Sequence, residues 1–171
     1  NKLKLLISIS TSGYAIPGSV ISAGLLIGFD AIFGTSITIY GIFGLILCLS
    51  FRFMTPAYNY SSSSLANISK SSENALSLVP SNPLKAFSSF YYPQMKSALF
   101  LGFMIVFIES VKEQAATLLL RPVGFDTLST KIYNFTSEGE WEMAASPSIL
   151  LIFLSLAFVY LINKNIDLNT K

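Results

Sequence analysis

Three charged side chains lie close together in an otherwise apolar part of this 171-residue sequence. Glu109, Lys112 and Glu113 follow the spacing i, i+3, i+4, which places them on one face of a helix. A charge at mid-membrane costs about 2.5–3.5 kcal/mol on insertion scales, so such residues face a protein interior or water. Two interpretations follow, and both can hold. The group is a structural ion pair at a helix end near the outer surface, or it lines a transport path.

The composition indicates which class of protein holds these charges. Apolar residues make up 52% of the sequence and charged residues 12%, against about 25% charged in soluble domains. With one cysteine (Cys48) and no histidine, the sequence excludes a disulfide scaffold, the usual zinc sites and Ser/Cys–His catalysis. The net charge of +2 is too small to indicate nucleic-acid binding. An integral membrane protein remains.

The apolar residues are gathered into runs long enough to cross a bilayer, which takes roughly 20 residues in a helix. Residues 5–29, 31–51 and 143–163 carry no charge, whereas the run over 97–108 is short unless the charged turn after it also lies at membrane depth. The sequence therefore predicts an all-α polytopic membrane bundle, with residues 1–171 forming one transmembrane domain. The predicted spans are about 13–29, 35–56, 97–120 and 143–163.

Lysine and arginine are distributed unequally between the two sides that four spans define. With the N-terminus, the loop over 57–96 and the C-terminus on one side, only Arg121 and Lys131 lie on the other. The first side is therefore predicted to be cytoplasmic, and the segment 121–142 to be outer. The cations on the cytoplasmic side are Lys2, Lys4, Lys70, Lys85, Lys96, Lys164 and Lys171, with Arg52 near its edge.

Two regions between or within the spans have a distinct composition. Ile16-Pro17-Gly18 breaks the first span, either for close helix packing or as a hinge that lines a path. In the cytoplasmic loop a serine run over 61–64 is typical of a low-complexity segment. Apolar residues at near-helical spacing nevertheless predict two amphipathic helices, about 62–78 and 82–91. We expect the first to be capped near Ser71-Ser72-Glu73.

The outer segment is predicted to contain a short surface helix over 127–135, followed by an acidic cluster. Glu138, Glu140 and Glu142 alternate around Trp141. Three carboxylates in five residues could hold a hard cation, but a solvated rim with Trp141 at the membrane interface is the favoured interpretation. No metal site and no cofactor is predicted.

Three stretches resemble the permease subunits of binding-protein-dependent ABC importers, and most of all the ferric-iron type. The first is Gly13-Tyr-Ala-Ile-Pro-Gly-Ser-Val20. The second runs from Glu73 to Pro93 and is similar to the family's Glu-Ala-Ala loop, although Asn74 replaces the first alanine and Val79, or Pro80, replaces the glycine. The third and most specific is Glu109-Ser-Val-Lys-Glu-Gln-Ala-Ala-Thr-Leu-Leu-Leu-Arg-Pro-Val-Gly-Phe-Asp-Thr-Leu128.

The resemblance implies a transport subunit of a bacterial inner membrane, not an enzyme. It implies the last four spans of the second half of a fused permease, in line with a chain that begins at Asn1 and is expected to be a fragment. Implied partners are a cytoplasmic ABC ATPase, a periplasmic binding protein, the rest of the permease or a second half, and membrane lipid. The chain has no G-x-x-x-x-G-K-[ST] phosphate loop of its own.

The resemblance also implies roles for individual residues. The coupling loop over 57–96 would contact the ATPase, and the path would be lined from the first and third spans. The coupling residues are Glu73, Ala75, Leu78, Val79, Pro80, Leu84, Phe87 and Pro93. The path candidates are Pro17, Gly18, Glu109, Lys112 and Glu113.

Two alternatives stay open. The same machine could carry another cargo: thiamine, a polyamine, a phosphonate or an oxyanion. A channel or scaffold that needs no ATPase is the alternative of another class, although such a protein would have no reason to carry amphipathic helices in its cytoplasmic loop. An intramembrane enzyme is disfavoured because no catalytic motif pairs carboxylates across spans.

Overall fold

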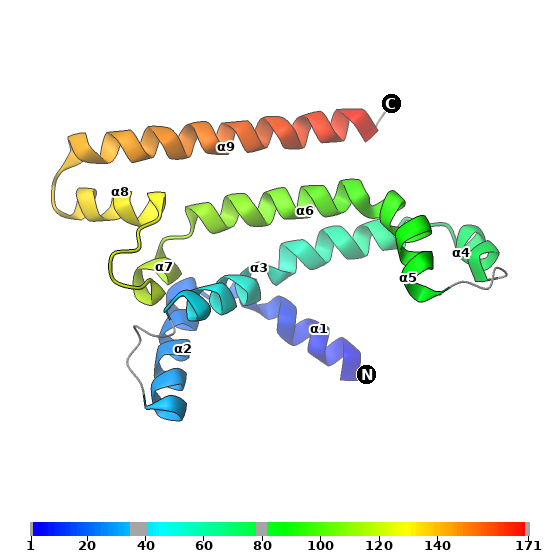
Figure 1. The fold of residues 1–171 in the computed structure, drawn as a ribbon, viewed down its shortest axis with the longest axis horizontal. Coiled ribbons are helices and arrows are strands. Elements are labelled where there is room, and N and C mark those ends of the chain that lie inside the picture. The colour runs from blue at the N-terminus through cyan, green and yellow to red at the C-terminus, as the bar shows by residue number, and fades with distance from the viewer. Residues whose placement is uncertain (1, 35–40, 78–81, 170–171) are drawn as a thin grey trace.

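The structure of the chain is a computed structural model that describes residues 2–34, 41–77 and 82–169. All regular structure in these residues is helical, which confirms the predicted all-α class (Figure 1). Three helical stretches are long and apolar enough to cross a membrane. A bent pair of helices, counted as one further span, brings the number to four. The elements are α1 (Lys2–Ser12), η1 (Gly13–Ala15), α2 (Gly18–Phe33), α3 (Gly41–Ala66), α4 (Lys70–Ser77), α5 (Pro83–Ala86), η3 (Phe87–Tyr91), α6 (Tyr92–Lys112), α7 (Ala115–Leu120), α8 (Leu128–Ser137) and α9 (Trp141–Asn169).

The first span is broken where the sequence predicts it. Ile16 and Pro17 adopt extended backbone angles, with ψ of 132° and 137°, because a residue before proline avoids the helical region and proline has no N–H to continue a helix. The helices on either side, Lys4–Ala15 and Gly18–Phe33, are bent by 114°. Figure 1 shows α1 and α2 diverging from this corner beside α3.

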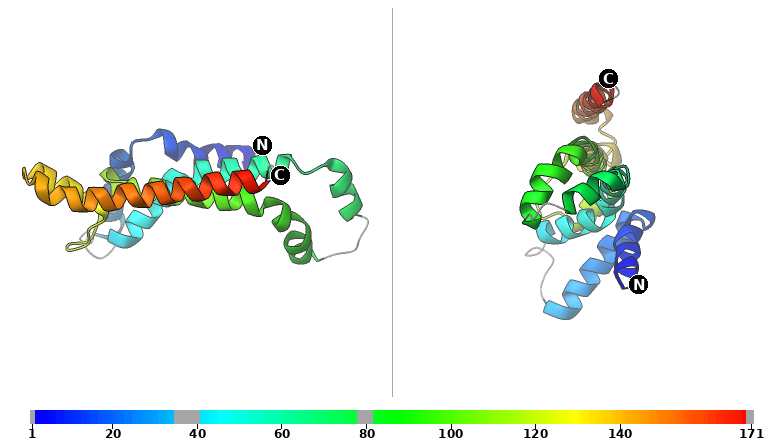
Figure 2. Two further views of the ribbon diagram at one scale, coloured as in Figure 1. Left: turned by 90° about the horizontal axis from the view of Figure 1, so that it is seen from above. Right: turned by 90° about the vertical axis from the view of Figure 1, so that its right-hand side faces the viewer.

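Helices α3, α6 and α9 form the long body of the molecule (Figures 1 and 2). Gly102 of α6 brings that helix close to α3, since a methyl carbon placed on it would lie 3.3 Å from Cβ of Tyr60. Helix α9 is fixed to α6 by the rings of Phe107 and Phe158, whose centroids are 4.7 Å apart. Most of α9 remains uncovered, and only 6% of its apolar window is buried. This surface is suited to lipid or to further helices.

The loop predicted to be cytoplasmic, residues 57–96, is more helical than its serine-rich composition suggests. Helix α3 continues to Ala66 and includes the serine run, in which hydroxyls such as that of Ser61 donate to carbonyls one turn earlier (Ser61 Oγ to Ala57 O, 2.8 Å). The helix predicted from residue 62 is therefore present as the end of α3. The prediction of one helix over 62–78 is wrong, because α3 ends at Ala66 and α4 begins at Lys70. Helix α4 is capped by Ser69, whose Oγ accepts from the Ser72 N–H at 3.2 Å, so it begins before the predicted cap.

The second loop helix is present but is not separate. Helix α5, the π-turn η3 and α6 follow one another from Pro83 to Lys112, and this 30-residue stretch qualifies as a membrane-crossing helix. Residues 79–81, which separate the two predicted loop helices, lie outside the described residues.

Candidate functional site

The charged turn of the third predicted span does not form one helical face. Helix α6 ends at Lys112, and Glu113 has extended angles of φ −69° and ψ 118°. Lys112 and Glu109 pair with each other at 2.8 Å on a partly exposed surface, whereas Glu113 turns inward and is only 8% exposed. The expectation that all three share one face is therefore wrong, because the helix ends before the third residue.

Glu113 makes hydrogen bonds to both helices that follow the end of α6. Its Oε1 accepts from the Ala116 N–H at 3.1 Å, which satisfies one of the unpaired donors at the start of α7. Its carbonyl oxygen accepts from Thr117 Oγ1 and from Ser129 Oγ, both at 3.0 Å. One residue thus joins the end of α6, the start of α7 and the outer helix α8.

Arg52 of α3 supplies the opposite charge. Its Nε lies 3.4 Å from Oε2 of Glu113, and its side chain is 23% exposed. The sequence alone does not predict this role, because the distribution of cations places Arg52 near the cytoplasmic edge, whereas α3 continues for fourteen residues beyond it, about 21 Å at helical rise. The available signal was the arginine itself, since a cation inside an apolar helix requires an acidic partner.

Gly18 completes the site from the start of α2. A methyl carbon placed on Gly18 would overlap Nη1 of Arg52 and would lie 2.8 Å from Oε1 of Glu113. The absence of a side chain therefore lets α2 approach the ion pair directly. Pro17, the residue before it, is exposed. Of the five path candidates, the structure brings together Gly18 and Glu113, and it adds Arg52 to them.

One face of α3 contains Arg52 and packs against α1, α2 and α7. Small and polar residues recur there at helical spacing and admit close neighbours. Gly41 lies against the backbone of Leu120, with a methyl carbon on it 2.8 Å from the carbonyl oxygen. Thr55 Oγ1 donates to the carbonyl of Thr11 at 2.5 Å. The face consists of Gly41, Gly44, Cys48, Arg52 and Thr55.

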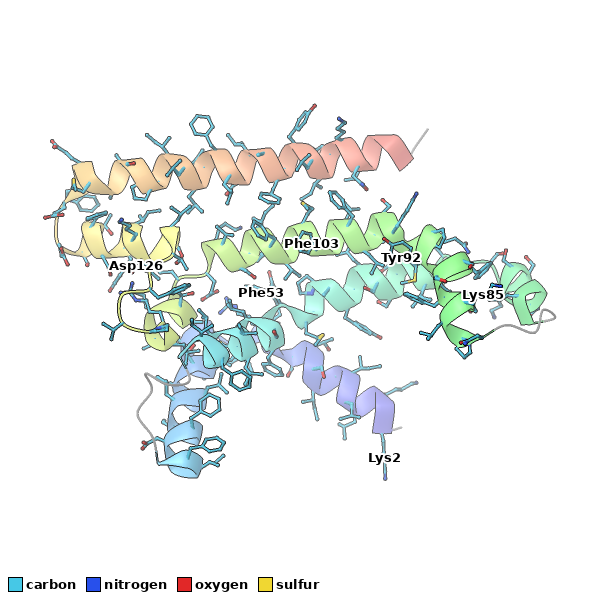
Figure 3. All side chains as sticks on the ribbon, in the orientation of Figure 1. Lys2, Phe53, Lys85, Tyr92, Phe103 and Asp126 are labelled. Atoms are coloured by element: carbon cyan, nitrogen blue, oxygen red, sulfur yellow. The ribbon has the colours of Figure 1, made fainter. Side chains whose placement is uncertain are left out.

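The residues expected to contact an ATPase lie near Lys85, at the opposite end of the long helices from Asp126 (Figure 3). Leu84 is 77% exposed and Phe87 50% exposed. Pro93 is exposed in the first turn of α6. Glu73 and Ala75 lie within α4. Leu78, Val79 and Pro80 lie outside the described residues.

The outer segment is held in shape by local interactions. Arg121 forms an ion pair with Asp126 across the turn. Thr127 and Thr130 form a reciprocal capping box at the start of α8, so the short helix predicted over 127–135 is present. The glutamates that follow α8, Glu138, Glu140 and Glu142, are exposed. Within the described part of the chain, no three His, Cys, Asp or Glu side chains are grouped as a metal site requires.

The amino-acid sequence is similar to curated transport proteins over most of its length. The chain is 28% identical over 152 residues to the Fe(3+)-transport system permease protein FbpB 2 of Haemophilus influenzae, covering 88% of this chain and 29% of that protein. It is also 28% identical over 124 residues to the ferric transport system permease protein FbpB of Actinobacillus pleuropneumoniae, covering 71% of this chain and 18% of that protein.

The chain is similar to ferric-transport permeases. This similarity confirms the resemblance carried by the three sequence stretches. The chain spans less than a third of the length of these two curated relatives. No family profile and no solved structure matches it.

Proposed function

We propose that this chain is part of the membrane permease of a bacterial ABC importer for ferric iron, located in the inner membrane. Similarity to ferric-transport permeases over 88% of the chain is the observation that carries the proposal. A periplasmic binding protein delivers the cargo, and a separate cytoplasmic ATPase drives transport. The rest of the permease, or a second half, completes the pathway.

The site of Gly18, Arg52 and Glu113 supports a place on the translocation path. Ionisable residues at membrane depth are expensive and mark ion or substrate pathways. Transporter sites also form where membrane helices are interrupted, and here α1–α2 and α6–α7 are both interrupted beside the ion pair. Glu109 and Lys112 lie on the surface of the last turn of α6, where they face the remainder of the permease in this proposal.

The arrangement of the loop supports coupling to an ATPase. The exposed apolar side chains of Leu84 and Phe87 are close in sequence to Lys85, which lies at the end of the long helices opposite Asp126 (Figure 3). An exposed apolar patch on a cytoplasmic surface requires a partner. Closure of the ATPase pair would move the loop helices as rigid bodies and shift the permease between inward- and outward-open states.

Uptake of radioactive ferric iron tests the proposal. Cells carrying the full permease, its ATPase and its binding protein should take up iron in an ATP-dependent manner, and Glu113→Gln should lower that uptake without preventing membrane insertion. Asp30→Asn is the matched control, since it removes a carboxylate from the exposed end of α2. ATP-dependent uptake of thiamine or a polyamine in place of iron would reject the cargo, and transport without the ATPase would reject the mechanism.

A further inference from the structure

The two carboxylate oxygens of Glu113 make contacts of different strength. Oε1 of Glu113 accepts from the Ala116 N–H at 3.1 Å. Oε2 faces Nε of Arg52 at 3.4 Å, longer than the 2.7–2.9 Å of a strong charge-assisted hydrogen bond, and this buried Nε has no hydrogen-bond partner. The carboxylate is therefore anchored to α7, and its contact with α3 is the weaker one.

This weak contact lies where three chain segments lose their regular helical hydrogen bonds. The α1–α2 break is at Pro17, and the α6–α7 break is at Glu113. Helix α3 contains Pro56, which has no N–H to donate to the carbonyl of Arg52 four residues earlier. Interrupted helices provide the few positions at which packed elements can rotate relative to one another.

We propose that Arg52 and Glu113 form a latch that holds the start of α2 and the α6–α7 break against α3, and that the transport cycle opens it. The latch part rests on contacts in this chain, and the opening rests on the proposed function. When Arg52 and Glu113 separate, Gly18 loses its closest neighbours and α2 and α7 can move away from α3 together. Ala116 supports joint movement, because a methyl carbon on Gly18 would contact its Cβ at 3.4 Å.

Cys48 is a native reporter of this movement. It lies four residues before Arg52 on the same face of α3, is fully buried, and contacts Ser22 of α2, with Sγ 3.5 Å from Oγ. While the latch is closed, α2 covers the thiol. When α2 moves away, a small thiol reagent can reach it.

The test measures labelling of Cys48 by a methanethiosulfonate reagent in the full permease complex, quantified by peptide mass spectrometry. In the wild-type complex labelling should be slow at rest and faster during ATP turnover. Arg52→Gln should raise the resting rate by about tenfold or more, which corresponds to about 1.4 kcal/mol in the opening equilibrium. Lys131→Gln, which neutralises an exposed cation on α8, should leave the labelling rate at the wild-type value.

A double variant keeps the test valid if Arg52→Gln fails to fold because Glu113 is left buried without its partner. Arg52→Gln combined with Glu113→Gln leaves no unpaired buried charge and should also raise the labelling rate. Wild-type labelling in the folded double variant would overturn the latch. Equal labelling of the wild-type complex at rest and during turnover would overturn its opening. The resting comparison needs no cargo, so it is independent of the iron-uptake test.

Discussion

Gly18 and Glu113 are 95 residues apart in the sequence, yet a methyl carbon on the glycine would lie 2.8 Å from the glutamate Oε1. The contact joins the start of α2 to the α6–α7 break, with Arg52 of α3 beside both. This relationship makes the site a single packed unit, so changes to each member should affect the stability of all three segments.

Replacing Glu113 with alanine should strongly destabilise the protein. Removing one partner of a buried ion pair leaves the other charge uncompensated, which costs about 3–5 kcal/mol. Glu109→Ala is the matched control, because its pair with Lys112 is partly exposed and such pairs contribute about 0–1 kcal/mol. Equilibrium unfolding in mixed micelles measures both, and equal losses would contradict the buried role of Glu113.

Gly18→Ala should destabilise the chain by about 1–3 kcal/mol, since an added methyl group in a packed site forces its neighbours to move. Gly24→Ala in the same helix should not, because nothing lies within 4 Å of a methyl carbon there. Alanine is favoured over glycine in a helix interior by about 1 kcal/mol. The same unfolding measurement compares them, and a stabilising Gly18→Ala would rule out the close approach of α2.

The sequence predicts some parts of this site and not others for physical reasons. The break at Pro17 follows from the covalent structure of proline, so it could be predicted locally. The end of α6 could not, because Glu109, Lys112 and Glu113 fit a continuing helix equally well, whereas the inward position of Glu113 involves contacts with Ser129 and Arg52 that are distant in the sequence. The partnership with Arg52 spans 61 residues and requires the packing of α3 against both breaks.

The serine run illustrates a different limit. A cluster of serines predicts a loop when each hydroxyl competes with the backbone, but Ser61 and Ser62 instead donate to carbonyls of their own helix. Packing of α3 against α6 through Gly102 and Tyr60 adds tertiary support to this part of the helix. Composition alone does not contain that information, whereas the spacing of the apolar residues does predict a helix from residue 62.

Ser129→Ala should separate the outer helix from the α6–α7 break. Ser129 is buried and donates to the Glu113 carbonyl at 3.0 Å, so its loss should cost about 1 kcal/mol. Ser137→Ala is the control, because the Ser137 hydroxyl is exposed and donates to Asn134 within its own helix. Hydrogen exchange of α8 should increase only in Ser129→Ala, and equal exchange in both variants would contradict the link.

Leu84→Ser should weaken association with the ATPase without destabilising the permease. The side chain is 77% exposed, so its replacement removes little buried apolar area from the chain itself. Val123→Ser is a matched control, because Val123 is 95% exposed in the turn between α7 and α8, at the other end of the long helices (Figure 1). In co-purification from membranes, only Leu84→Ser should reduce the amount of bound ATPase. Full ATPase recovery with Leu84→Ser would show that this end of the helices is not the coupling surface.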